Sequence, residues 1–317
     1  MALQPPSFPW HEGEVALQRR LGVAERMSEI GSRVVRDYMP DQHRDFFAQL
    51  PCVVIGAVDP AGDAWASIAV GHPGFLASPD PRSLEISMPR DPRDPADAGL
   101  EDGDAIGLLG IELHSRRRNR MNGHVLRKHA GTFAVRVEHS FGNCPRYIQR
   151  RDFEFVGDPA QPSTAQAEAF TELNGRLRDI IAKADTFFVA SYADGPTGRQ
   201  VDVSHRGGRP GFVRVAADGL LTIPDFSGNL HFNTLGNFVV NPHAGLLFVD
   251  FETGDLVQLT GTPELVLESP EIDAFEGAER LWTFRTRRAI LRQGALALRW
   301  VMREEGWSPN TLKTGIW

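Results

Sequence analysis

The 317-residue sequence has very little cysteine and no long apolar run. Cys52 and Cys144 are its two cysteines, too few for a disulfide framework or a cysteine-rich zinc site. No stretch approaches the roughly 18 consecutive apolar residues of a membrane-spanning helix, and the N-terminus lacks the pattern of a signal peptide. The ten histidines show no helical metal-ligand spacing. We therefore expect a cytoplasmic protein with no metal site and no membrane partner.

Positive charge is also in short supply. Lys and Arg number 34 against 41 Asp and Glu, which gives a net charge of −7. Because nucleic acid binding needs a positive surface that displaces counterions from phosphates, we expect no nucleic acid partner. The densest basic run, 116–120, precedes Asn122-Gly123, a turn signal, so we interpret the run as a solvated hairpin tip.

Several short motifs recur at a nearly constant spacing, which predicts an internal duplication. The linker between the two copies is expected at 156–162, where Pro, Gly and polar residues gather. We accordingly predict two domains, 1–157 and 158–317. The recurring motifs are Pro73-Gly74-Phe75 and Pro210-Gly211-Phe212, Gly107-Leu108-Leu109 and Gly245-Leu246-Leu247, and Asn122-Gly123 and Thr260-Gly261.

Each copy contains many short β-rich runs closed by Gly, Pro or Asp turns, beginning with 52–58 in the first and 187–192 in the second. Short strands joined by turns predict an antiparallel barrel instead of a parallel sheet. A helix is expected before each copy: a loosely patterned one over 23–38, and one that begins with a capping box at 163–166.

The stretch from Val201 to Pro242 carries the most informative polar pattern. It includes Ser204-His205-Arg206-Gly207-Gly208-Arg209-Pro210-Gly211-Phe212-Val213-Arg214, then Asp225-Phe226-Ser227-Gly228-Asn229-Leu230-His231-Phe232-Asn233-Thr234, and it ends with Asn241-Pro242. This pattern resembles the pyridoxamine 5′-phosphate oxidase-like family of flavin-binding proteins. In that family an Arg and a basic residue five positions later precede an Asn-, Ser- or Thr-rich turn and a helix that ends in Asn-Pro. The resemblance covers roughly residues 45 to 300 and implies a mainly β fold with flanking helices, built as two tandem antiparallel split β-barrel domains.

The same resemblance implies FMN as the cofactor. Its phosphate needs cations and hydroxyl donors, and its ring needs an apolar wall. Arg209 and Arg214 supply cations, while Asn233 and Thr234 supply neutral donors close to an expected helix start. The resemblance implies phosphate contact for Arg209 and a position nearer the ring for Arg214. Further cofactor contacts expected in this copy are Phe212, Val213, Asp225, Asn229 and His231, the last lying in the turn where the oxidases carry a lysine.

A second segment, 140–151, follows the last strand of the first copy and has no counterpart in the second. Related split-barrel proteins carry a similar Asn-Cys-Pro-basic segment beside the flavin, so the resemblance implies a composite site. Cys144 is expected to be a packed thiol, because no His or Asp partner is evident. In 280–288 aromatic and basic residues alternate, which favours a strand with one buried aromatic face. The expected first-copy contacts are Asn143, Pro145, Arg146, Tyr147 and Gln149.

Three functions compete at this stage. The first is an FMN-dependent oxidoreductase that acts on an unidentified small-molecule substrate, with no catalytic residue evident. Because the sequence has no nicotinamide-binding Gly-x-Gly-x-x-Gly unit after a strand, NAD(P)H would bind transiently or a reductase partner would supply electrons. The second is a non-catalytic protein of the same fold that holds flavin, deazaflavin or haem. The third is a structural dimerisation module. The resemblance implies a homodimer, although two copies in one chain could also close the barrel pair internally.

Overall fold

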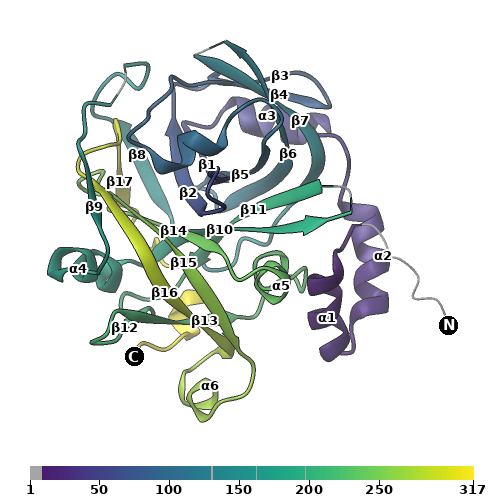
Figure 1. The fold of residues 1–317 in the computed structure, drawn as a ribbon, viewed down its shortest axis with the longest axis vertical. Helices are drawn as coiled ribbons and strands as arrows, with labels where there is room; N and C mark the ends of the chain where they lie inside the picture. Colours follow the sequence, from purple (N-terminus) through teal and green to yellow (C-terminus); the bar gives the residue numbers. More distant parts are fainter. Residues whose placement is uncertain (1–8, 130, 162, 197) are drawn as a thin grey trace.

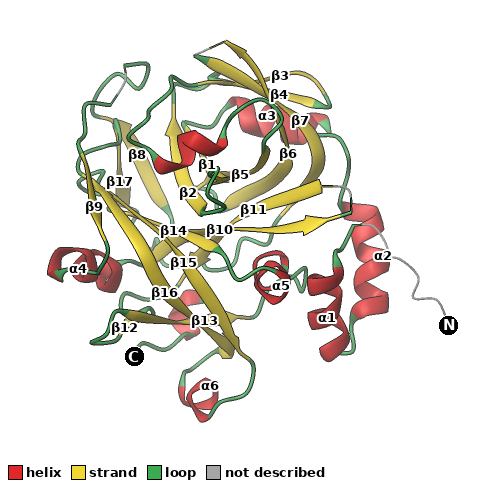
Figure 2. Ribbon diagram, in the orientation of Figure 1, coloured by secondary structure: helices red, strands yellow, loops and turns green. Residues whose placement is uncertain are grey.

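Two antiparallel sheets of seven and eight strands, flanked by short helices, form the molecule (Figures 1 and 2). The structure is a computed structural model that describes residues 9–129, 131–161, 163–196 and 198–317. The predicted mainly β fold with flanking helices is confirmed. None of the described helices is long and apolar enough to cross a membrane.

Residues up to 157, called the first half here, form the seven-stranded sheet. Strands β1 and β2 are buried along nearly their whole length, because their own core covers one face and the other half covers the opposite face. The elements of this half are α1 (Glu12–Arg20), α2 (Ala24–Val34), α3 (Asp41–Ala48), β1 (Cys52–Val58), β2 (Ala64–Val70), β3 (Leu76–Asp80), β4 (Ser83–Ser87), η1 (Pro95–Gly99), β5 (Ala105–Glu112), β6 (Arg117–His129), β7 (Thr132–Gly142) and β8 (Arg151–Phe155).

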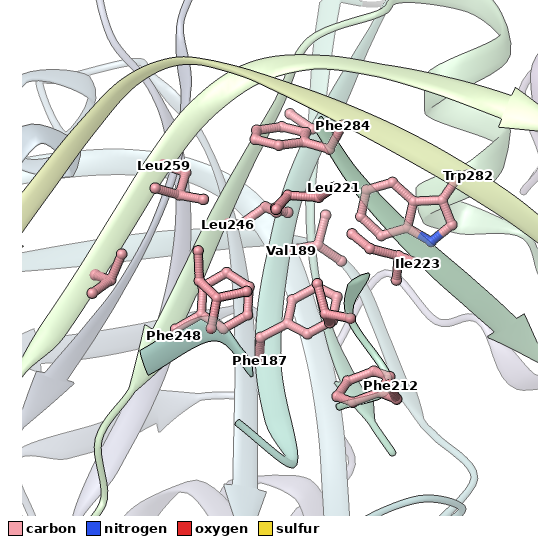
Figure 3. Packing of buried hydrophobic residues seen from close by; sticks show 14 of the residues in the cluster. Phe187, Val189, Phe212, Leu221, Ile223, Leu246, Phe248, Leu259, Trp282 and Phe284 are labelled. Carbon is pink, nitrogen blue, oxygen red and sulfur yellow. The ribbon is translucent and has the colours of Figure 1, made fainter. Parts of the chain in front are cut away.

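The second half, from 158 onward, forms the eight-stranded sheet. Its core is aromatic: the ring of Phe187 stacks on Phe248 at 5.1 Å and on Phe212 at 5.8 Å, under fully buried Trp282 and Phe284 (Figure 3). The elements of this half are β9 (Ala167–Phe170), α4 (Gly175–Lys183), β10 (Thr186–Gly195), β11 (Gly198–Gly207), β12 (Arg214–Val215), β13 (Leu220–Phe226), α5 (Asn233–Val240), β14 (Ala244–Val249), β15 (Leu256–Val266), α6 (Pro270–Ala274), β16 (Ala278–Arg292), β17 (Leu298–Met302) and η2 (Thr311–Lys313).

The two sheets have the same order of strands. The first is β2-β1-β5-β6-β7-β4-β3 and the second is β11-β10-β14-β15-β16-β13-β12, with β9 added alongside β16. Matching the strands in chain order therefore pairs β1 with β10, β2 with β11, and each later strand with its counterpart. This shared order supports the duplication that the recurring motifs predict.

The Asn122-Gly123 motif is not a turn, which corrects the sequence interpretation. Both Gly123 and Gly261 sit where the strand register shifts, inside β6 and β15. A Cβ at Gly123 would lie 1.9 Å from the carbonyl oxygen of Arg136, and one at Gly261 would lie 2.1 Å from that of Arg285. Such a bulge admits only glycine. The predicted hairpin tip is present at Arg116, in the turn between β5 and β6, but the rest of the basic run opens the long strand β6, and Arg120 is buried.

The expected helix starts shift as well. Residues 167–170 form β9, and α4 begins only at Gly175, where the Asn174 side chain accepts a hydrogen bond from the Leu177 amide at 3.0 Å. The Ser163 segment therefore does not cap this helix, because the chain pairs with β16 before it turns helical. The buried aromatic face predicted for 280–288 is confirmed by Trp282 and Phe284.

The two halves pack face to face through their backbones. A Cβ at Gly107 would lie 2.7 Å from the carbonyl oxygen of Val201, and one at Gly245 would lie 2.4 Å from that of Ala64. Strand β8 of the first half also pairs with β17 of the second. The boundary at 157 stays a prediction, but besides its own core each half contributes to one shared hydrophobic cluster, which includes Val54 and Phe188.

Candidate functional site

The polar segments singled out from the sequence meet in a small cavity between the halves. It has a volume of about 100 Å³ and is lined by β6 and 143–147 from the first half, and by β11, the end of β13 and the start of α5 from the second. We call it the cationic cavity. The sequence-predicted residues that line it are Phe212, Asp225, Asn229, Asn233, Thr234, Asn143, Arg146 and Tyr147.

Five arginines line the cationic cavity, against a single carboxylate, Asp225, among the described lining residues. Asp225 forms an ion pair with Arg280 at 3.1 Å and a longer one with Arg206 at 3.6 Å. Positive charge is therefore in clear excess at this place in an acidic protein. The five are Arg118, Arg120, Arg146, Arg206 and Arg280.

Two of these guanidinium groups have no carboxylate within ion-pair distance in the described chain. Arg118 donates to the carbonyl oxygen of Cys144 at 2.8 Å, and Arg146 donates to Ser227 Oγ at 3.1 Å. Burial, together with neighbouring Arg120 and Arg206, lowers the pKa of Arg118 to about 9, so it stays charged at neutral pH. An anionic ligand in the cavity would remove this repulsion.

Several buried polar atoms at the cavity lack a hydrogen-bond partner among the described residues. They include Nε of Arg206, Nδ2 of Asn143 and both ring nitrogens of His205. Burial, and then Arg118 and Arg206, hold the pKa of His205 well below its usual range, so its imidazole is neutral. Unpaired buried donors cost free energy, which a ligand with acceptor oxygens would recover.

The N-terminus of α5 also favours an anionic ligand in the cationic cavity. The N-cap Phe232 is in the left-handed region and offers no side-chain cap for the first turn of α5. Thr234 Oγ1 lies 2.9 Å from Ser204 Oγ, which also accepts a hydrogen bond from Arg120. Free amide groups at a helix start attract anions. The cavity thus combines cations, hydroxyls and helix amides.

Helix α1 holds α5 in place, a contribution that the sequence did not reveal. A Cβ at Gly13 would lie 2.1 Å from the carbonyl oxygen of Gly236, so α1 and α5 touch through glycine. Asn233 Nδ2 donates to Glu14 Oε1 at 2.6 Å. Burial, and then nearby Asp202, raises the pKa of Glu14 well above its usual range.

A buried hydrogen-bond chain continues from α1 to the cavity. His11 Nδ1 accepts from the Gly13 amide, so Nε2 carries the proton and donates to Asn237 Oδ1 at 2.8 Å. Asn237 Nδ2 donates to Asp202 Oδ2 at 3.2 Å, and Arg120 Nη1 donates to Asp202 Oδ1 at 2.6 Å. Burial opposes ionisation of Asp202, but Arg120 and these amides outweigh it and lower its pKa. Asp202 therefore anchors Arg120 from behind.

Arg209, predicted to contact the phosphate, and Arg214, predicted to lie nearer the ring, do not line the cavity. Arg209 is exposed, while Arg214 forms an ion pair with Glu271 at 2.9 Å and lies over the ring of Trp317 at 4.0 Å. The reason is local: only 214–215 is strand here, and the preceding residues turn at Gly211, whose φ is 88°. The continuous arginine-bearing strand that the resemblance implied does not form.

The remaining predicted residues also have other surroundings. Val213 is part of the aromatic core, and Pro145 lies in a separate surface depression. Gln149 is fully buried and donates to Thr311 Oγ1 at 3.0 Å. His231 packs 4.7 Å from the ring of Trp10, and burial lowers its pKa to about 4. None of these four residues lines the cationic cavity.

The residues that sequence reasoning missed are Arg118, Arg120, His205, Arg206 and Arg280. Their signals were present in part, because Arg118 and Arg120 belong to the basic run and His205 and Arg206 to the polar stretch. Only the pairing of β6 beside β5 and the packing of β11 on β5 bring these strands together.

The edge of the cavity stores backbone strain. Tyr147, Leu230 and Phe232 have φ of 67°, 63° and 61°, and all three line the cavity. Left-handed conformations of bulky residues are costly and gather at functional sites. The Tyr147 hydroxyl donates to the Ser227 carbonyl oxygen at 3.1 Å, which ties the two halves together across the edge.

No protein-family model matches the chain, and no curated protein matches its sequence. Among solved structures, HupZ of Group A Streptococcus is 16% identical with a TM-score of 0.30, covering 38% of this chain and 98% of HupZ. HutZ, a heme storage protein of Vibrio cholerae, is 12% identical with a TM-score of 0.27, covering 39% of this chain and 96% of HutZ. A protein of Bacteroides thetaiotaomicron to which 5-nitroimidazole antibiotic resistance is ascribed is 11% identical with a TM-score of 0.27. The match covers 45% of this chain and 93% of that protein. Similarities this low assign no function.

Proposed function

We propose that this chain binds FMN, with the phosphate in the cationic cavity, and that it serves a flavin-dependent oxidoreduction of a small molecule. The observation that carries the proposal is the excess of five arginines over one carboxylate, beside the uncapped start of α5. A phosphate dianion is the natural counterpart of guanidinium forks and helix amides. When bound, the flavin supplies hydride or electron transfer.

The cavity fits the phosphate end of the ligand better than the ring. Its volume of about 100 Å³ admits a phosphate group, whereas cofactor pockets usually measure about 300–1,000 Å³. Binding of the ring therefore requires the contact between Tyr147 and Ser227 to open. Phe226 lies 5.1 Å from the Tyr147 ring and would supply aromatic surface at that edge.

The test compares two arginines that differ in position. Added FMN should bind the wild-type protein with quenching of flavin fluorescence, and Arg118→Ala should weaken binding by about 10- to 100-fold, the range of a charge-assisted hydrogen bond. Arg209→Ala, a matched control outside the cavity, should leave the affinity within about twofold. Absence of FMN binding, or equal effects of the two substitutions, would refute the proposal.

Catalysis is tested separately from binding. Bleaching of the bound flavin by NADH or NADPH supports the enzyme, whereas a stable yellow protein supports a non-catalytic flavin carrier. A deazaflavin with the same phosphate should show the same dependence on Arg118 but a different absorption spectrum. Gel filtration at several concentrations checks the proposed homodimer.

Haem is a second candidate, favoured by one observation. His205 is buried and neutral, and its ring nitrogens have no hydrogen-bond partner among the described residues. An imidazole in that state is a common iron ligand. A Soret band that appears on adding haemin and disappears in His205→Ala would favour haem over FMN.

A further inference from the structure

A second cavity lies between the halves, in a place that corresponds to the cationic cavity, and β2, the counterpart of β11, lines it. It measures about 490 Å³ and is lined by β2, the segment from β4 into η1, residues between 156 and 164, the start of β15 at Leu256, and the segment from Arg292 to Arg299. We call it the first-half cavity. The register proves the correspondence: Ser67 lies opposite Ile55 on β1 as Ser204 lies opposite Val189 on β10. The molecule thus has two related cavities between its halves.

Arg120, one of the arginines that make the cationic cavity positive, has a neutral counterpart, Gln258, which donates to Asp94 of the first-half cavity at 2.9 Å. Gln258 lies opposite Leu247, the position that Arg120 takes opposite Leu109. Asp94 accepts a hydrogen bond from Ser67, as Thr234 contacts Ser204 in the other cavity. A carboxylate therefore stands where the cationic cavity has a hydroxyl.

The charge balance changes sign accordingly. Among the described lining residues, the first-half cavity has three arginines and four aspartates. Most of these charges pair with each other: Arg292 binds Asp94 at 3.0 Å and Asp91 at 2.5 Å, and Arg90 binds Asp97 at 2.8 Å. No excess of positive charge is left for a phosphate.

The first-half cavity nevertheless has the features of a ligand site. Its volume lies in the usual range of about 300–1,000 Å³ for small-molecule pockets. Ile68, Leu256 and Leu296 supply apolar walls. The Arg292 side chain is only 5% exposed, and its Nε has no partner among the described residues. That buried donor calls for an acceptor atom on a ligand.

We propose that the first-half cavity is a second ligand site, which takes an uncharged aromatic molecule and rejects its phosphorylated form. Asp94 repels a phosphate at the place where Thr234 admits one, and the apolar walls with the single donor of Arg292 suit a neutral ring that bears an acceptor. This inference rests on the lining of the first-half cavity and stands apart from FMN binding in the cationic cavity.

Riboflavin and FMN test the inference, because they differ only in the phosphate. In equilibrium dialysis the wild-type protein should bind riboflavin, and Ala297→Trp, which fills the first-half cavity, should weaken riboflavin binding at least tenfold while FMN binding is retained. Unchanged riboflavin binding in Ala297→Trp would overturn the inference. Wild-type protein that binds FMN but no riboflavin would also overturn the inference and leave the proposed function intact. Wild-type protein that binds riboflavin but no FMN would refute the proposed function and leave the inference intact.

A second variant guards against misfolding of Ala297→Trp. Asp94→Thr copies the residue of the cationic cavity, and it should add a second equivalent of FMN binding to the protein. FMN stoichiometry that stays at the wild-type value in a folded Asp94→Thr protein, as judged by circular dichroism, contradicts the selection against phosphate.

Discussion

The cationic cavity and the first-half cavity occupy corresponding places in the two sheets, yet they carry opposite charge balances. The strand order is shared, so the backbone alone does not decide which ligand each cavity can take. A few side chains do: Arg120 against Gln258 and Asp202 against Trp65 at equivalent register positions, and Thr234 beside Ser204 against Asp94 beside Ser67. Equivalent places in one architecture can therefore hold different ligands.

The comparison of Asp202 with Trp65 predicts the largest effect. Asp202 holds buried Arg120, whereas Trp65 donates its ring N–H to Asp59 at 3.0 Å and packs under Arg288, which does not line the first-half cavity. Asp202→Ala should lower the free energy of unfolding by about 3–5 kcal/mol, because it leaves a buried charge unpaired. Urea denaturation measures the change. The double variant Asp202→Ala, Arg120→Met should recover much of the loss, and a double variant as unstable as the single one contradicts this account.

The second-largest effect is expected when Thr234 is replaced by aspartate, the residue type that Asp94 provides in the first-half cavity. Thr234→Asp should weaken FMN binding by about 100-fold or more, since a like charge about 4 Å away costs several kcal/mol in a partly buried site. Thr234→Val, which removes the hydroxyl without adding charge, should cost about tenfold at most. Fluorescence titration compares both with wild type. Equal losses in the two variants would mean that charge does not govern the cavity.

Acid should weaken the side of the molecule that contains the cationic cavity. The pKa of His231 falls to about 4 and that of His205 lies well below its usual range, mainly because both are buried. Since the unfolded histidines take up protons first, stability is full above about pH 6.5 and is lost as the pH falls toward 4, by about 2–3 kcal/mol for His231.

Hydrogen exchange measured against pH compares α5, beside the cationic cavity, with η1, beside the first-half cavity. Acid should speed exchange in α5 more than in η1, because the described residues lining the first-half cavity include no histidine. His231→Phe keeps the ring contact with Trp10 and should flatten the pH dependence. An unchanged slope in this variant assigns the acid sensitivity to other groups.

The smallest effect concerns the edges of the cavities. The cationic cavity is closed by the Tyr147 hydroxyl on Ser227, whereas at the first-half cavity the Val156 amide bonds the Ala297 carbonyl oxygen at 2.9 Å. Tyr147→Phe should cost about 0.5–1.5 kcal/mol of stability, the value of one hydrogen bond. It should also speed FMN association in stopped-flow fluorescence, and a slower association would show that this contact does not obstruct entry.

Much of the fold was predictable, since apolar strands between Gly and Pro turns leave a clear local signal. The strand 52–58 was predicted with the bounds that the structure gives. The errors arose where long-range pairing overrides local chemistry. Asn122-Gly123 suits a turn, but in β6 the glycine makes room for the Arg136 carbonyl. The capping box at 163–166 suits a helix, but β16 recruits the following residues as β9.

The candidate site was predictable in its segments but, apart from Arg146, not in its cations. The sequence indicated that 143–149 and 225–234 would approach one another, and most of these residues line the cationic cavity. It indicated Arg209 and Arg214 as the cations of the cofactor site, because an arginine has the same local signature whichever way its side chain points. The side on which an arginine lies depends on register and on where a strand ends, as the short β12 shows.

The sequence by itself determined the β-rich architecture, the recurrence of motifs and the segments rich in phosphate-binding side chains, because periodicity and turn chemistry are local. Only the tertiary structure decided which arginines remain without carboxylates and which of two related cavities is positive. Charge at a cavity is a sum over side chains from distant strands, and Arg118 and Thr234 become neighbours of one cavity only when the two sheets pack together.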